Sequence, residues 1–90
     1  MRRSATWTTL RATLEALHQS VVEEIRAYPL PITACDAQFN RLLELRRLLP
    51  EELARLDAAS DDAGASVDAF VHTSPCRAEI AATEAASSEP

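Results

Sequence analysis

The sequence contains one glycine and two cysteines, and only 4% of its 90 residues are aromatic. Because Gly64 is the single glycine, a loop that cradles a phosphate group is nearly excluded, and a protein built of strands and tight turns is disfavoured. The sequence also lacks a nucleophile elbow, a Cys-x-x-Cys pair and a zinc-protease helix. We therefore expect a protein that is not an enzyme and that takes no cofactor.

Long apolar runs are missing as well. No stretch approaches the roughly 18 apolar residues of a membrane span, and threonine and arginine interrupt the N-terminal region where a secretory leader would be apolar. Cys35 and Cys76 are too few for a disulfide framework. We expect a cytoplasmic protein without membrane contact, in which these cysteines would pair with each other or across sister chains only in an oxidising compartment.

The residues that are abundant favour helices. Hydrophobic residues make up 47% of the chain and are mainly alanine and leucine, which join glutamate and arginine as strong helix formers. No segment is a convincing strand. The sequence therefore predicts an all-α fold.

A first helix is predicted over about residues 6–28, with Ser4 or Thr6 as its cap. Its apolar residues recur at spacings of three and four, which places them on one face of a helix. They are Trp7, Leu10, Leu14, Leu17, Val21, Ile25 and Tyr28. His18 lies beside this stripe, and we expect it to be half-buried.

A break must follow, because Pro29 and Pro31 lack the backbone N–H and push the preceding residues toward extended conformations. We predict a stiff elbow over 29–33. Thr33 is the expected cap of the next helix, and the negative charge of Asp36 favours a helix start.

A second helix is predicted over about 34–59, bent near Pro50, where a backbone hydrogen bond is lost. Its apolar stripe comprises Phe39, Leu42, Leu45, Leu49, Leu53 and Leu56. The opposite side alternates in charge and predicts a solvated face of Glu44, Arg47, Glu51 and Arg55. Adjacent glutamates, including Glu51 and Glu52, point about 100° apart on a helix, so we expect solvated charges and not a catalytic pair.

From residue 60 the composition changes. Residues 57–90 contain seven acidic residues against one arginine, Arg77, within a chain of net charge −5. We expect residues 60–90 to form a largely disordered acidic tail with a short helix over about 75–86, because Ile80 is the only large apolar residue of that helix.

Residues 1–59 then form an antiparallel two-helix hairpin, whose core has one open side. Either the segment around Phe70 completes a third layer, or two hairpins pair into a four-helix bundle. We favour a homodimer, since Leu43 and Leu48 fall outside the apolar stripe and Arg46 lies at its edge. These three residues are the candidate interface.

The elbow offers a second candidate surface, for a protein partner. Cys35, Asp36, Gln38 and Asn40 lie in or beside the first turn of the second helix, where their polar groups could bind specifically. An alternative is a redox- or ligand-responsive module, because a helix N-terminus raises the reactivity of a thiol such as that of Cys35.

Two other chemistries have little support. A metal site at His72 and Cys76 would need Cys35 and His18 to complete it, with no second paired motif. A nucleic-acid-associated regulator would use Arg41, Arg46, Arg47 and Arg55, but acidic residues separate these arginines and the tail is acidic. The sequence thus predicts a small non-enzymatic helical interaction protein that self-associates, binds a protein partner, or does both.

Overall fold

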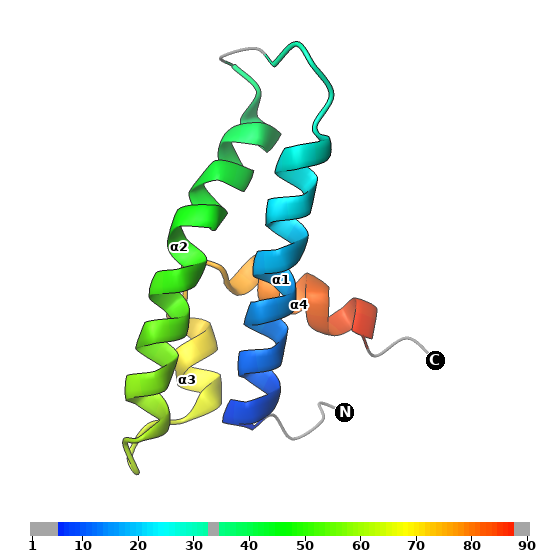
Figure 1. Cartoon of the computed structure of the whole chain (residues 1–90). Helices are drawn as coiled ribbons and strands as arrows, with labels where there is room; N and C mark the ends of the chain where they lie inside the picture. The colour runs from blue at the N-terminus through cyan, green and yellow to red at the C-terminus, as the bar shows by residue number, and fades with distance from the viewer. Residues whose placement is uncertain (1–5, 33–34, 88–90) are drawn as a thin grey trace.

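The computed structural model describes residues 6–32 and 35–87, which form four helices and no strand. In chain order they are α1 (Trp7–Ala27), α2 (Ala37–Ser60), α3 (Val67–His72) and α4 (Arg77–Ser87) (Figure 1). The predicted all-α class is confirmed for these residues.

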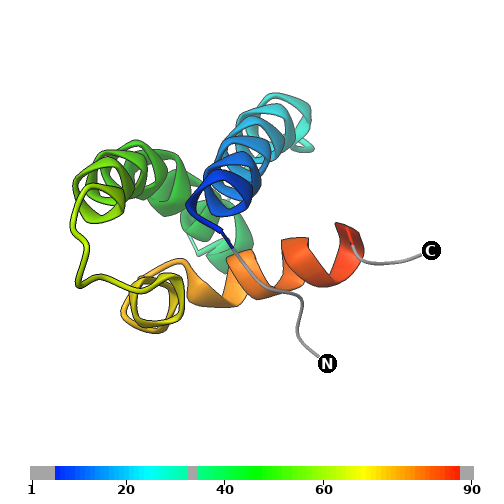
Figure 2. The same ribbon diagram turned by 90° about the horizontal axis from the view of Figure 1, so that it is seen from below.

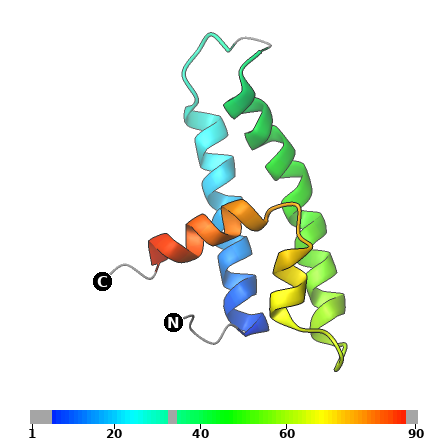
Figure 3. The same ribbon diagram turned by 180° about the vertical axis from the view of Figure 1, so that it is seen from behind.

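The helices form two layers. α1 and α2 lie side by side, run in opposite directions and contact each other along their length (Figure 1). Seen from below, α3 and α4 lie against one side of this pair (Figure 2). From behind, α3 lies beside the C-terminal part of α2, and α4 crosses α1 (Figure 3), which it contacts. The open side that a two-helix pair would leave is therefore covered by the same chain.

The start and the end of α1 have clear local causes. Thr6 caps the helix: its hydroxyl accepts from the backbone N–H of Thr9, while the hydroxyl of Thr9 accepts from the backbone N–H of Thr6. The helix ends at Ala27, because Tyr28 is extended and Pro29 follows. The expected helix over about 6–28 therefore differs from α1 by one residue at each end.

The second helix begins at Ala37, later than the expected start at about 34. Asp36 is its N-cap and accepts from the backbone N–H of Phe39 at 2.9 Å. The expected cap, Thr33, lies outside the described residues. Pro50 lies inside α2, which continues past it to Ser60. A bend at Pro50 remains a prediction.

Eleven apolar side chains of the described residues form the buried core, and three of them lie C-terminal to α2. The members are Leu10, Leu14, Leu17, Val21, Leu42, Leu45, Leu49, Leu56, Phe70, Cys76 and Ile80. Cys76 and Ile80 are fully buried. The ring of Phe70 packs edge-on against Trp7, with 5.9 Å between the ring centroids and 85° between the ring planes. The second layer is thus part of the core and not an appendage.

This arrangement corrects the expectation that residues 60–90 are largely disordered. Helices as short as α3 and α4 are marginal in isolation, but Ser66 caps α3 by accepting from the N–H of Ala69, and Phe70 and Ile80 gain their burial from α1 and α2. A short helix was expected over about 75–86, and α4 covers Arg77–Ser87. Residues 88–90 lie outside the described part of the chain.

Replacing Phe70 by alanine should lower the free energy of unfolding by about 3–5 kcal/mol, because it empties a buried aromatic site between the layers. Urea unfolding followed by circular dichroism measures this change. The matched control is Leu30→Ala, whose side chain is 80% exposed and whose loss should change stability by less than about 0.5 kcal/mol. Equally small effects of both substitutions would show that α3 is not part of the core.

Candidate functional site

The segment between α1 and α2 extends beyond the ends of both helices, away from α3 and α4 (Figure 1). At its turn lie Pro29, Leu30 and Pro31, all exposed, which we call the elbow tip. Leu30 is 80% exposed, and no other large hydrophobic side chain among the described residues is so open to solvent. The Leu30–Pro31 peptide bond is cis. The elbow tip therefore presents an apolar side chain between two conformationally restricted residues.

The base of the elbow is tied together by Tyr28 and Asp36, which lie at its two ends. The hydroxyl of Tyr28 donates to the carboxylate of Asp36, with 2.8 Å to each oxygen. The ring of Tyr28 also packs against Phe39 in α2, with 4.8 Å between the ring centroids. Since Asp36 also caps α2, one carboxylate closes the elbow and starts the next helix. The elbow tip thus rests on a fixed base.

The ionisation of this pair follows from its hydrogen bonds. The backbone N–H of Phe39 and, next, the hydroxyl of Tyr28 stabilise the charged carboxylate and lower the pKa of Asp36. Donation to Asp36 raises the pKa of Tyr28, since the neutral phenol is the donor. At neutral pH the base therefore contains a charged acceptor and a neutral donor.

The structure places the four predicted elbow residues in different roles. Cys35, Gln38 and Asn40 are exposed around the base, whereas Asp36 is half-buried and its carboxylate is engaged within the chain. Cys35 and Cys76 are both free thiols. Burial raises the pKa of the Cys76 thiol, so the accessible cysteine of this pair is Cys35. Leu30, which the sequence pattern did not single out, is the most exposed apolar group of the elbow.

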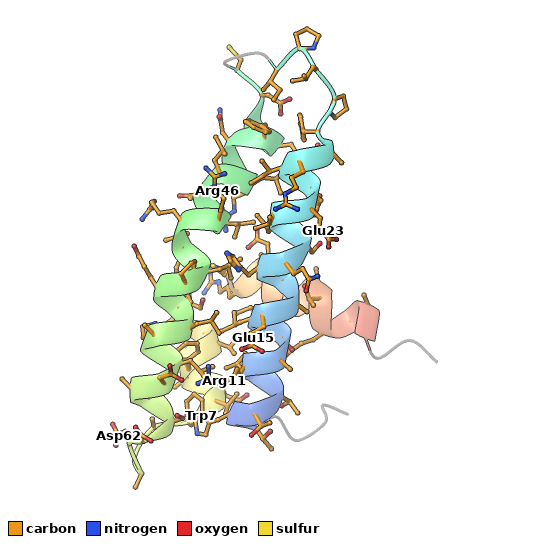
Figure 4. All side chains as sticks on the ribbon, in the orientation of Figure 1. Trp7, Arg11, Glu15, Glu23, Arg46 and Asp62 are labelled. Atoms are coloured by element: carbon orange, nitrogen blue, oxygen red, sulfur yellow. The ribbon has the colours of Figure 1, made fainter. Side chains whose placement is uncertain are left out.

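The structure does not gather the predicted interface into one patch. Leu48 is half-buried and packs against the core, and Leu43 is half-buried beside an open depression that Arg47 also lines. Arg46 is exposed on the part of α2 nearer the elbow (Figure 4). Leu43 and Leu48 are five positions apart, which separates them by about 140° around a helix. An interface through Leu43, Arg46 and Leu48 therefore remains a prediction.

A polar cluster that the sequence did not reveal joins α2 to the turn after α3. Glu52 is only 6% exposed, which corrects its expected place among the solvated charges. Its carboxylate accepts from Arg55 Nη2 at 2.8 Å and Nε at 3.1 Å, and from the hydroxyl of Ser74 at 2.8 Å. Ser74 covers Glu52 from the second layer. Burial raises the pKa of Glu52, but the bonds from Arg55 and Ser74 outweigh this effect, so the pKa is lowered.

Arg55 also contacts the second layer directly. Its guanidinium lies over the Phe70 ring, 3.8 Å from the ring centroid, and Nη2 donates to the Phe70 carbonyl at 3.3 Å. Arg55 is exposed, as the predicted solvated face requires, and it also contacts α3. The same arginine holds a carboxylate of its own helix and an aromatic ring of α3.

A second cluster joins α2 to α4. Arg41 donates from Nε and Nη2 to the two carboxylate oxygens of Glu79 at 3.0 and 2.9 Å, and from Nη2 to the Pro75 carbonyl at 3.0 Å. Its Nη1 donates to Glu44. Arg41 lowers the pKa of Glu79, and the two carboxylates raise the pKa of Arg41. Two of the four arginines considered for nucleic-acid binding, Arg41 and Arg55, are thus neutralised within the chain.

Metal sites and membrane spans are missing from the described residues. No group of three or more His, Cys, Asp or Glu side chains in residues 6–32 and 35–87 could hold a metal ion. Nor is any helix of this part of the chain long and apolar enough to cross a membrane.

Compared with known proteins, the chain matches no family model, no curated protein and no solved structure. Function must be argued from the surfaces themselves.

The Asp36 cap predicts a pH-dependent stability term. Because its folded-state pKa is lowered, the stability difference between the native chain and Asp36→Ala should be full above the unfolded-state pKa of about 3.9. That difference should shrink as pH falls through the lower folded-state pKa. Urea unfolding between about pH 7 and pH 2 measures it, with the exposed Glu15→Gln as control. A difference that is constant over this range would contradict the role of the charged carboxylate.

Proposed function

We propose that this chain is a small non-enzymatic helical protein that binds a protein partner through the elbow tip. The observation that supports this most directly is the 80% exposure of Leu30 between two exposed prolines. A leucine held in this way loses little conformational freedom on binding, because the flanking prolines and the base below already restrict the backbone. An apolar side chain on a stiff support is suited to enter a pocket of another protein.

The residues around the elbow tip indicate the chemistry of that partner. Gln38 and Asn40 are exposed in the first turn of α2, and Cys35 is exposed beside them. Protein interfaces combine an apolar centre with a polar rim. We therefore infer a partner with an apolar pocket for Leu30 and hydrogen-bonding groups at the rim of that pocket.

The polar clusters favour a structural role over catalysis. Glu52, Arg55, Arg41 and Glu79 pair with one another or with the backbone, and the carboxylates are held in their charged forms. A general acid or base works best with a pKa near the operating pH, whereas these two carboxyl groups are shifted away from it. Two free thiols are typical of a reducing compartment, so we also propose a cytoplasmic location.

Three forms of the full chain test the proposal: the native chain, Leu30→Asp, and Ala16→Asp as a control that adds the same charge on an exposed site of α1. A protein retained from cell extract by the native chain is purified, and its Kd for each form is measured by calorimetry. We expect Leu30→Asp to weaken binding by about tenfold or more, a loss of about 1.4 kcal/mol, and Ala16→Asp to leave it unchanged.

Circular dichroism should show the same helicity for all three forms, because neither substituted side chain is in the core. Equal affinity of the native chain and Leu30→Asp for the purified partner would overturn the assignment of the elbow tip. The assignment would also fall if every protein retained by the native chain were retained equally by Leu30→Asp.

A further inference from the structure

Residues 67–87, which we call the arm, comprise α3, the following turn and α4. The arm contributes Phe70, Cys76 and Ile80 to the core, and Phe70 packs on Trp7 of α1. Without the arm, the α1–α2 pair would have an uncovered apolar side, and a core this small supplies little stability in water. We propose that the arm blocks self-association by occupying the face through which two α1–α2 pairs would otherwise pack into a four-helix bundle. This face is separate from the elbow tip.

The arm is joined to α2 by a short connection that does little to hold it. Residues 61–66 contain only aspartate, alanine, glycine and serine, and five of the six are exposed. Within the arm, most residues of α4 other than Ile80 are small or polar. Attachment thus depends on three buried apolar side chains, on Val67 and Val71, which pack against the core, and on the two polar clusters with α2.

The polar clusters add a smaller share of the resistance to release than the apolar contacts do. Arg55 and Glu52 are three positions apart on the same helix, so their ion pair remains when the arm leaves, and Glu52 regains contact with water. Arg41 likewise keeps Glu44 as a partner on α2. What is lost is the contact with Glu79, Ser74 and backbone carbonyls of the arm. The Arg41–Glu79 pair is partly exposed, and the buried Glu52 keeps Arg55 as its partner, so the polar contacts of the arm contribute less than its apolar contacts.

A second copy of this chain is the occupant that fits the uncovered face. Antiparallel pairs of amphipathic helices with spacings of three and four pack into four-helix bundles. The α2 residues that contact the arm through polar groups, Arg41, Glu52 and Arg55, lie with Glu44 within about 80° on a helical projection. In a two-fold antiparallel contact, residue i meets j and j meets i. Arg41 of one copy can then face Glu52 of the other, and the two-fold axis repeats this pair. The charged side of α2 is therefore complementary to the same side of a second copy.

The experiment uses full-length chains altered only in the arm. Ile80→Asp places a charge at a fully buried site and prevents docking, while Ala81→Asp adds the same charge at an exposed site of the same helix. A milder variant, Ser74→Ala with Glu79→Gln, removes the hydrogen bond to Glu52 and the negative charge that pairs with Arg41. Molar mass is measured by light scattering, helicity by circular dichroism, and thiol exposure by reaction with a thiol reagent.

Cys35 and Cys76 make the thiol measurement informative. Cys35 is exposed and Cys76 is fully buried at the start of α4, so one fast thiol indicates a docked arm and two indicate a released arm. We expect the native chain and Ala81→Asp to be monomers with one reactive thiol. The Ile80→Asp chain should be a helical dimer in which both thiols of each chain react. The double variant should raise the association constant by about tenfold, or about 1.4 kcal/mol.

The proposal is overturned if the native chain is already a dimer with Cys76 protected, because pairing would then not need the covered face. A dimeric variant with Cys76 protected would also overturn it, since the arms would have been exchanged and not displaced. An Ile80→Asp chain that remains a folded monomer would also overturn the proposal. If Ile80→Asp unfolds, the double variant decides: a dimer with reactive Cys76 supports the proposal, and unchanged association contradicts it.

Discussion

Two amphipathic helices packed against each other leave their shared core open to water on one side. The rest of this structure depends on closing that side. The chain meets the constraint with its own C-terminal third. Phe70, Cys76 and Ile80 enter the core formed by α1 and α2, and the aromatic contact between Phe70 and Trp7 joins residues 63 positions apart in the sequence. The helicity of the arm depends on these contacts, because isolated helices of such length are marginal in water.

The same constraint divides the molecule into a closed region and an exposed one. Around the arm, apolar groups are buried and the guanidinium and carboxylate groups that contact it are paired. At the elbow, Tyr28 and Asp36 satisfy each other and cap α2, but Leu30 has no helix against which to pack. The proposed partner contact and the proposed control of self-association therefore use different parts of the fold. Each can be altered without removing the residues of the other.

How far the sequence predicts this structure depends on whether the decisive contact is local. The spacing of Leu10, Leu14, Leu17 and Val21 predicted one face of a helix, and all four are buried. The prolines predicted that a break must follow Tyr28. A third layer around Phe70 and a short helix over about 75–86 were among the alternatives, but disorder was favoured, because these segments were judged in isolation while their burial comes from distant residues. Glu51 and Glu52 are identical neighbours in the sequence, but Glu52 is buried and accepts from Ser74, 22 positions further along the chain. For Leu30 a local indication did exist, since a leucine between two prolines cannot belong to a helix face.

The central claim is that one chain closes its own core through the arm, and nuclear Overhauser effects between the rings of Trp7 and Phe70 test it most directly. A sample mixed from isotopically labelled and unlabelled chains separates contacts within a chain from contacts between chains. With ring centroids 5.9 Å apart, the account predicts strong effects within a chain and none between chains. An absent effect, or one seen only between labelled and unlabelled chains, would contradict it.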